Sequence, residues 1–342
     1  AASDGAASSY GDAGGIPQLR AALAAKLREE NGLQGVEVMV TTGANQAYVN
    51  LVLALVDAGD AVVLFEPFYF NHLMAFQMTG SARSVEPGKT TPALLPDVEW
   101  LAARLGAEDQ PAIRMVTVIN PGNPTGVTIP EATLRRISEL CATHGSWLVV
   151  DNTYEYFTYE DEGAPAHSCV GGDHVINVFS FSKAFGMMGW RVGYLAFPPR
   201  LMASLLKVQD TIPICPAIAS QRMALAALDA GRGWVKSRVA GLSEQKRLAR
   251  EAIKDTLGED RLLGGSGAIY LMLRLPVAYQ DDVAVVRWLA EKHGVCVIPG
   301  SACGAVGCLR VSYANNTVEQ CEEAVRRLRA GLAELAAGTA VV

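Results

Sequence analysis

The segment with the clearest capacity for covalent chemistry surrounds Lys183. This lysine follows an apolar run, and two small hydroxyl residues, Ser180 and Ser182, precede it. An amine held partly out of water has a lowered pKa and reacts readily with an aldehyde. Arg191 follows in a glycine-rich stretch, and an arginine with serine hydroxyls is a good donor set for phosphate. A surface lysine in a flexible loop is the alternative, which the glycines and Arg191 disfavour.

Two further segments have the composition of ligand-binding turns. Asn120–Gly126 (NPGNPTG) follows an apolar run, and its prolines and glycines would hold Asn123 rigidly at the carboxyl edge of a sheet, where ligands of α/β proteins bind. Thr41–Gln46 (TTGANQ) precedes a helical pattern, and a helix start of small residues is an anion site. An ordinary rigid turn and an ordinary capped helix are the alternatives. The chain has no P-loop motif.

Two charged residues occupy positions in apolar runs where they need a partner. Asp151 ends the run SWLVVD, shortly before Tyr154, and a carboxylate there suits a protonated ring nitrogen such as that of pyridoxal phosphate. Arg310 lies within the run LRVSY, where a substrate carboxylate could pair with it bidentately. Helix capping explains many residues like Asp151. A structural ion pair is an equally good explanation of Arg310.

The segments that would position these residues alternate between strands and helices. Short, fully apolar runs with turn residues nearby predict strands covered on both faces, which is typical of a mainly parallel sheet. Strands are expected over Ala61–Phe65, Met115–Ile119, Ser146–Val150, Val175–Phe179 and Val192–Phe197, and helices over Asn45–Val56 and Pro130–His144.

The carboxyl-terminal part of the chain has a different rhythm. A long helical pattern runs from Pro216 to Leu257 and is interrupted by Gly231 and Gly233. Strands are then expected over Ile269–Leu275, Val295–Ile298 and Leu309–Tyr313, and helices over Asp281–His293 and Thr317–Leu335. We therefore expect an extended arm over residues 1–15, a large domain over 16–240 and a small α/β domain over 241–342.

Composition excludes several classes of protein. The chain has 342 residues, half of them hydrophobic, so a sizeable core is available, and its net charge of -6 argues against nucleic acid as a partner. Seven cysteines without a C-x-x-C suggest neither a disulfide framework nor a zinc site, so we expect no metal. No run approaches the roughly 20 apolar residues of a membrane helix, so we expect no membrane partner.

Taken together, the motifs resemble those of fold-type I pyridoxal-5′-phosphate (PLP) enzymes, specifically class I/II aminotransferases. The phosphate-binding turn, NPGNPTG, D-x-x-Y, S-x-S-K with its later arginine, and R-x-S stand in the family's order. The opening YGDAGG at Tyr10, with Leu19 and Arg20, is similar as well. FEPFYFNHLMAFQMTG and FSFSKAFGMMGWRVGY look closest to the plant and algal aromatic/methionine aminotransferases. The fold implied is a large domain with a mainly parallel seven-stranded-type sheet between helices and a smaller C-terminal α/β domain.

The resemblance implies a role for each candidate residue. Lys183 would hold PLP as a Schiff base and carry a proton, and Asp151 would pair with the ring nitrogen. Further cofactor contacts are implied for Asn123 and Tyr154 at the ring hydroxyl, Tyr69 stacked on the ring, Ala44, Asn45, Ser180, Ser182 and Arg191 at the phosphate, and Tyr10 at the phosphate of the neighbouring subunit. Arg310 and Asn123 would bind the substrate, with Tyr69, Phe70 and Tyr270 as candidates for the pocket lining.

The implied function is a PLP-dependent aminotransferase that moves the amino group of an L-amino acid, preferably methionine or an aromatic one, to a 2-oxo acid by a ping-pong mechanism. A homodimer is implied, and we expect a cytoplasmic location, with a plastid as the alternative. A PLP lyase or synthase of the same fold, such as a C–S lyase or an aminocyclopropane-carboxylate synthase type, would use the same cofactor contacts. A non-catalytic PLP-binding protein is disfavoured by the presence of Lys183 and Asp151.

The chain departs from the family pattern in two places. Family members usually carry several dozen residues ahead of the Tyr10 motif, which contribute one wall of the substrate pocket, so we expect that segment to be missing here. Asn152 stands where many relatives have glutamate or aspartate. That position is not a usual cofactor contact, and we expect little effect.

Overall fold

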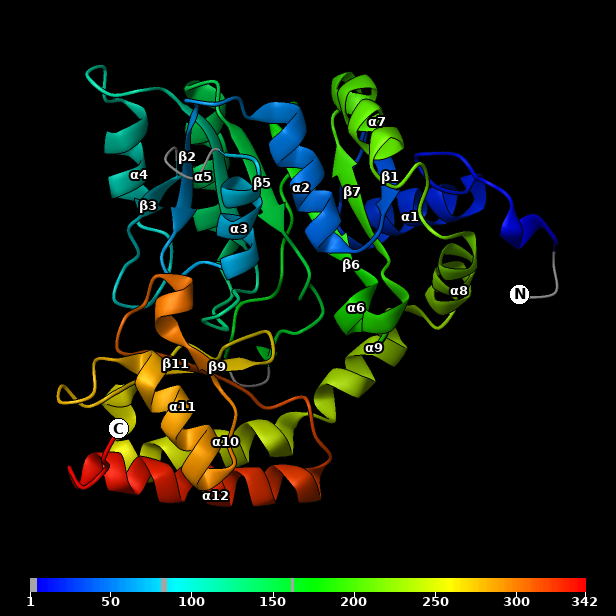
Figure 1. Cartoon of the computed structure of the whole chain (residues 1–342). Helices are drawn as coiled ribbons and strands as arrows, with labels where there is room; N and C mark the ends of the chain where they lie inside the picture. The colour runs from blue at the N-terminus through cyan, green and yellow to red at the C-terminus, as the bar shows by residue number, and fades with distance from the viewer. Residues whose placement is uncertain (1–4, 81–84, 161–162) are drawn as a thin grey trace.

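The computed structural model describes residues 5–80, 85–160 and 163–342. Its larger part is built on a seven-stranded sheet with the order β1-β7-β6-β5-β4-β2-β3, and helices cover both faces (Figure 1). The strands are β1 (Glu37–Thr41), β2 (Ala61–Phe65), β3 (Val85–Gly88), β4 (Ile113–Ile119), β5 (Trp147–Asp151), β6 (Val175–Ser180) and β7 (Gly193–Phe197).

Strand direction in this sheet places many loops at one edge. The neighbouring pairs from β3 through β2, β4 and β5 to β6 are all parallel, and β7 runs antiparallel to both β6 and β1. Strands β1 to β6 therefore point the same way, and the start of β7 lies at the edge where they end. In a sheet of this kind, ligands bind outside the carboxyl ends of the strands.

Side chains alternate between the two helical layers because successive residues of a strand point to opposite faces. Val62 and Leu64 pack with α2 (Ala44–Leu55), α3 (Phe70–Met78) and α7 (Met202–Thr211). On the other face, Val63 and Phe65 pack with α4 and α5, and the β1 and β7 end of the sheet is covered by α1 and α8. These helices are α1 (Pro17–Glu30), α4 (Val98–Leu105), α5 (Glu131–Thr143) and α8 (Ile218–Leu228).

A second, antiparallel sheet of four strands, with the order β10-β11-β9-β8, lies below the first in Figure 1. Its strands are β8 (Leu262–Leu263), β9 (Tyr270–Arg274), β10 (Ile298–Pro299) and β11 (Cys308–Ser312). Its helices are α9 (Gly231–Ala240), which descends from the large sheet, α10 (Ser243–Leu257), α11 (Asp282–His293) and α12 (Val318–Ala336). Their core includes Tyr154 and Phe157 from the segment after β5, which joins the two parts.

The expected fold class is confirmed, because a mostly parallel seven-stranded sheet lies between helices beside a smaller α/β part. The strand expected over Val295–Ile298 is largely wrong, since only its last residue pairs with β11. The Val295 N–H instead donates to Leu289 O at 3.1 Å and closes the end of α11. The domain limits at residues 15 and 240 stay a prediction. Across the described residues, no helix is long and apolar enough to cross a membrane.

The start of α2 packs closely against β7 at Gly193, and a substitution there tests this contact. A Cβ atom built on Gly193 would lie 2.7 Å from Ala44 N and 2.9 Å from Phe179 O, closer than real contacts allow. We expect Gly193→Ala to lower the free energy of unfolding by about 1–3 kcal/mol, because backbone has to move to admit the methyl group. Urea unfolding measures this change.

The control for this prediction is Gly233→Ala in α9, where an added Cβ meets no atom within 4 Å. Alanine is favoured over glycine within a helix by up to about 1 kcal/mol, so this variant should be as stable as the wild type or more so. Equal unfolding midpoints for the Gly193 and Gly233 variants would contradict the close approach.

Candidate active site

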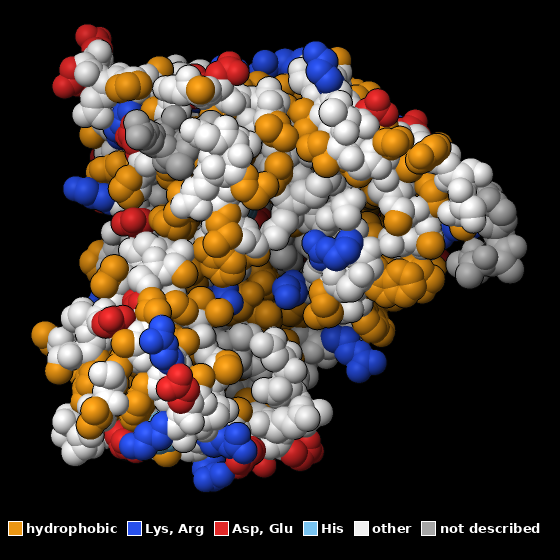
Figure 2. Space-filling view, viewed as in Figure 1, with side chains coloured by type: hydrophobic (Ala, Val, Ile, Leu, Met, Phe, Trp, Pro, Cys, Tyr) orange, Lys and Arg blue, Asp and Glu red, His pale blue; other side chains and the backbone are white. Residues whose placement is uncertain are grey.

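A cavity of about 290 Å³ lies at the carboxyl edge of the large sheet, and two residues of the small sheet, Tyr270 and Arg310, also line it. Figure 2 shows a hollow between the two parts of the molecule, in which basic and hydrophobic side chains gather. The lining residues are Ala44, Asn45, Tyr69, Phe70, Ile119, Asn123, Asp151, Thr153, Tyr154, Ser180, Ser182, Lys183, Met188, Arg191, Tyr270 and Arg310. Every cofactor or substrate residue predicted from the sequence is among them, except Tyr10.

The sheet brings these residues together from distant parts of the chain. Ala44 and Asn45 begin the helix after β1, Tyr69 follows β2, and Asn123 follows β4. Asp151 and Tyr154 end or follow β5, Ser180 ends β6, and Arg191 precedes the reversed strand β7. Arg310 and Tyr270 come from β11 and β9 of the small sheet. The cavity therefore exists only when both sheets are packed together.

Lys183 lies on α6 (Phe181–Ala184), a single helical turn that begins where β6 ends. The hydroxyl of Ser180 accepts a hydrogen bond from Ser182 N at 3.1 Å and caps this turn. Burial lowers the pKa of the Lys183 ammonium, and the positive charges of Arg310 and Arg191 lower it further. All three effects disfavour the charged form, so the amine is more readily available as a nucleophile than that of an exposed lysine.

The start of α2 and Arg191 form a compact set of anion donors. Gly43 precedes α2 without any side-chain cap, so the first N–H groups of that helix are left for a ligand. A Cβ on Gly43 would lie 2.2 Å from Arg191 Nη2, so only glycine lets the guanidinium approach the turn. Arg191 Nη1 also donates to Met188 O at 2.8 Å and to Ser182 Oγ at 3.5 Å. This donor set fits a phosphate group.

Asp151 is a buried carboxylate held by two donors. His72 Nε2 lies 3.2 Å from Asp151 Oδ2, and Thr153 N donates to Asp151 Oδ1 at 2.9 Å. Burial alone would raise the pKa of Asp151, but the contacts with His72 and Thr153 outweigh burial and hold the pKa below its ordinary value. Asp151 is therefore ionised at neutral pH and fits the partner that a protonated ring nitrogen requires.

Two tyrosine hydroxyls and the Arg310 guanidinium also lie in the cavity wall. Tyr154 Oη and Tyr270 Oη lie 2.5 Å apart, and burial raises the pKa of both tyrosines, so both are neutral at physiological pH. Arg310 Nη1 donates to Asn123 Oδ1 at 2.8 Å, and its guanidinium lies 4.5 Å from the centre of the Tyr270 ring. Arg310 Nε is buried without a hydrogen-bond partner. The guanidinium therefore has donor capacity left for a carboxylate.

Sequence reasoning missed His72, which lies on α3 and whose ring stacks on Tyr48 with centroids 3.9 Å apart. His72 is the lone imidazole of a mostly apolar helix after a strand, and such a residue is a weak signal of function. Thr153 was also missed, although its N–H is fixed by its place two residues after Asp151. Tyr10 is 81% exposed and does not line the cavity of its own chain, so its role stays a prediction.

Comparison with known proteins identifies the family. The family model described as "Aminotransferase class I and II" matches residues 1–328. The chain belongs to the class I and II aminotransferases. It is 52% identical over 331 residues to aromatic aminotransferase ISS1 from Arabidopsis thaliana, covering 96% of this chain and 83% of that protein. It is 32% identical over 315 residues to aspartate/prephenate aminotransferase from Thermus thermophilus, covering 90% of this chain and 79% of that one.

Solved structures agree with this membership. The structure of Thermus thermophilus aspartate aminotransferase with maleate matches with a TM-score of 0.85 at 30% identity, over 94% of this chain and 84% of that one. The aromatic aminotransferase from Pyrococcus horikoshii OT3 matches with a TM-score of 0.83 at 28% identity, over 95% of this chain and 88% of that one. Class I and II aminotransferases are PLP-dependent, and the protein is a PLP-dependent aminotransferase. The phosphate donors and the ionised Asp151 fit that cofactor.

The contact between His72 and Asp151 gives a pH-dependent prediction. A carboxyl whose folded pKa lies below its unfolded value stabilises the protein above the unfolded pKa, roughly pH 4, and this stability is lost as pH falls through the folded pKa. His72→Phe keeps a ring against Tyr48 but removes the donor. The buried Asp151 carboxylate then keeps only the Thr153 N–H as a donor, and the variant should lose about 1–3 kcal/mol of stability. The loss should grow as pH rises from roughly 3.5 to 7.

Urea unfolding of both proteins across this pH range measures the difference. His144→Phe is the matched control, because His144 is exposed at the end of α5, and its curve should run parallel to that of the wild type. A His72→Phe curve that also ran parallel to the wild type would show that His72 does not set the ionisation of Asp151.

Proposed function

We propose that this aminotransferase acts on aromatic amino acids and methionine as amino donors and on a 2-oxo acid as acceptor. The observation that carries the proposal is the chemistry of the cavity wall. Among the described residues that line it, the basic ones are Lys183, Arg191 and Arg310, and the first two are committed to the cofactor in our proposal. Arg310 is then left for the α-carboxylate, and the cavity offers Tyr69 and Phe70 to the substrate side chain.

Aromatic rings are well suited to an apolar or polarisable side chain. Tyr69 and Phe70 lie with ring centroids 4.9 Å apart, and the Phe70 ring also lies 5.8 Å from the Arg310 guanidinium. Rings and thioethers gain from edge and offset contacts with such a wall. A second carboxylate would find no further cation among the described lining residues once Lys183, Arg191 and Arg310 are engaged. The similarity to a protein named aromatic aminotransferase supports the same substrate class.

Each residue has a proposed task in the reaction. Bound PLP supplies the electron sink that stabilises negative charge at the substrate Cα. Lys183, whose Nζ has a lowered pKa, would hold the cofactor and would carry the proton from Cα. Asp151 keeps the ring nitrogen protonated, and Tyr154 and Asn123 orient the ring hydroxyl. Arg310 fixes the substrate carboxylate, which aligns the Cα–H bond with Lys183.

The two half-reactions would follow a ping-pong order, in which the 2-oxo acid product leaves the site before the second substrate binds to the same Arg310. We also propose that the protein acts as a homodimer in which Tyr10 reaches the phosphate site of the partner subunit. The 81% exposure of Tyr10, and its absence from the cavity of its own chain, support this arrangement.

The visible absorbance of the PLP-loaded protein tests the substrate class. L-Phenylalanine or L-methionine should remove the absorbance of the oxidised cofactor, and indole-3-pyruvate should restore it, because the amino group enters and leaves in separate steps. We expect kcat/KM for these donors to exceed that for L-aspartate by about tenfold or more, a difference that pocket chemistry can produce. Equal values for L-aspartate would discard the substrate class while keeping the transaminase.

Lys183→Ala is the control for this experiment, because it removes the proton carrier and should show neither step at a measurable rate. Near-normal rates in that variant would overturn the role of Lys183. Turnover of the wild type without any added 2-oxo acid would indicate a lyase instead.

Arg310→Lys tests carboxylate recognition. A lysine keeps the positive charge but loses the planar pair of donors, so we expect kcat/KM to fall by about hundredfold, mostly through a higher KM. Arg274→Lys, at the exposed end of β9, is the matched control and should leave both constants unchanged. Steady-state kinetics with L-phenylalanine measure the change, and a loss confined to kcat would contradict a binding role.

A further inference from the structure

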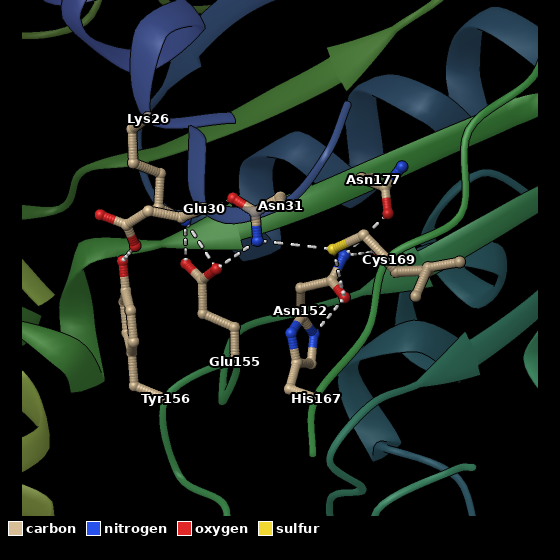
Figure 3. Close-up of polar contacts among 10 residues, drawn as sticks. Lys26, Glu30, Asn31, Asn152, Glu155, Tyr156, His167, Cys169 and Asn177 are labelled. Atoms are coloured by element: carbon tan, nitrogen blue, oxygen red, sulfur yellow. Dashed lines mark hydrogen bonds and ion pairs between the residues drawn. The ribbon is translucent and has the colours of Figure 1, made fainter. Parts of the chain in front are cut away.

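A buried polar network lies beside the active-site cavity, where α1 meets the ends of β5 and β6 (Figure 3). At its centre, the side chains of Lys26 and Glu155 are each 8% exposed, and Lys26 Nζ lies 2.6 Å from both carboxylate oxygens of Glu155. Neither residue lines the cavity, and the reaction proposed above uses neither of them. A buried ion pair outside a catalytic site needs another explanation, because its desolvation is costly.

The surroundings of Lys26 fix its ammonium in one place. Its Nζ also donates to Asn31 Oδ1 at 2.9 Å, and Asn31 Nδ2 in turn donates to Glu155 Oε2 at 2.8 Å. The same Nζ lies 5.2 Å from the centre of the Tyr156 ring and 4.8 Å from that of Phe179. Tyr156 follows Glu155 after β5, and Phe179 precedes Ser180 in β6. Lys26 therefore bridges the ends of the two strands that carry the cofactor residues.

Glu155 is connected to the cofactor residues through a short turn. It directly follows Tyr154, and its N–H donates to Asn152 O at 2.9 Å. Within the same turn, the Thr153 N–H donates to Asp151 Oδ1 at 2.9 Å. Asp151 begins this turn and Tyr154 lies within it, and both side chains point into the cavity. The anchor of the Glu155 carboxylate therefore limits how far the turn can rotate.

The other side of the turn is held by neutral groups. Asn152 Nδ2 donates to Asn177 Oδ1 at 3.0 Å, and Asn177 Nδ2 donates to Val170 O at 3.0 Å. His167 Nε2 lies 2.9 Å from Asn152 Oδ1, and burial, with the nearby charges of Lys26 and Arg232, lowers the pKa of His167 to about 3. The imidazole is therefore uncharged at neutral pH. On the side of Glu155, the turn is held by the charged contact with Lys26.

We propose that Lys26 is a positioning residue for the cofactor, acting through Glu155. The ion pair holds the turn from Asp151 to Tyr154, and the contact with Phe179 keeps that turn in register with the strand that leads to Lys183. Loss of the ion pair would let the Asp151 carboxylate and the Tyr154 hydroxyl move relative to the cofactor ring. The inference rests on the PLP-dependent function, and its test uses PLP itself, without any amino acid substrate.

The first test is Lys26→Met, which keeps the length of the side chain and removes its charge. We expect the dissociation constant for PLP to rise by roughly tenfold to a hundredfold, by analogy with the loss of metal affinity when a residue that orients a metal ligand is removed. We also expect the visible circular dichroism of bound PLP, measured at saturation, to fall per bound cofactor, because that signal depends on a fixed ring orientation. Lys292→Met removes a lysine from an exposed ion pair with Glu334 and should change neither value.

The double variant Lys26→Met with Glu155→Gln separates positioning from folding. It leaves no uncompensated buried charge, so its thermal midpoint should return close to that of the wild type even if Lys26→Met alone folds poorly. A positioning role predicts that its PLP affinity and dichroism stay reduced. Wild-type affinity and dichroism in a folded Lys26→Met protein, or in the double variant, would overturn the proposal. Failure of the wild type to bind PLP would instead count against the proposed function.

Discussion

The ionised carboxylate of Asp151 is the constraint on which the active site depends. It lies at the end of a strand whose other residues are apolar and buried, so burial by itself favours the neutral acid. Two donors reverse that preference, one from the turn that follows and one from His72 on α3. The stacked Tyr48 ring, whose hydroxyl lies 2.8 Å from Thr117 Oγ1, keeps the imidazole in place. A charged partner for the cofactor ring is therefore stabilised by residues of three different elements.

Two arginines near Lys183 carry the same charge as its ammonium, whereas the carboxylate of Asp151 lies against His72. Arg191 and Arg310 line the same cavity as the lysine, and both lower the pKa of its ammonium. Each is held by a different kind of contact, Arg191 by backbone and a serine, and Arg310 by Asn123 and the Tyr270 ring. In the function proposed above, the same guanidinium groups bind the phosphate and the carboxylate of the reactants. In that proposal, the two arginines that lower the pKa of the amine also bind the anionic groups next to it.

The small sheet contributes Tyr270 and Arg310 to the cavity wall, and packing against the large part sets the position of both residues. Tyr154 and Phe157 belong to the segment after β5, yet they lie in the hydrophobic core of the small part. That shared core places Tyr270 and Arg310 against residues that follow the parallel strands. On the opposite side of the same segment, the Lys26 ion pair anchors it to α1. The segment after β5 is therefore held from both sides, which suits a loop that must present two groups to one ring.

The sequence by itself determined the chemistry of the site and its ligand class. The residue types indicate the chemistry of Lys183, Asp151 and Arg191. Each of these residues lies near the beginning or the end of an apolar run that predicts a strand. The tertiary structure alone decided which groups meet. His72 and Lys26 gave no usable signal, because a lone histidine or lysine in a helix is ordinary until a buried carboxylate is placed beside it. Hydrogen bonds and ion pairs between distant segments depend on packing that no local pattern contains, whereas strand ends follow from the local pattern of apolar residues.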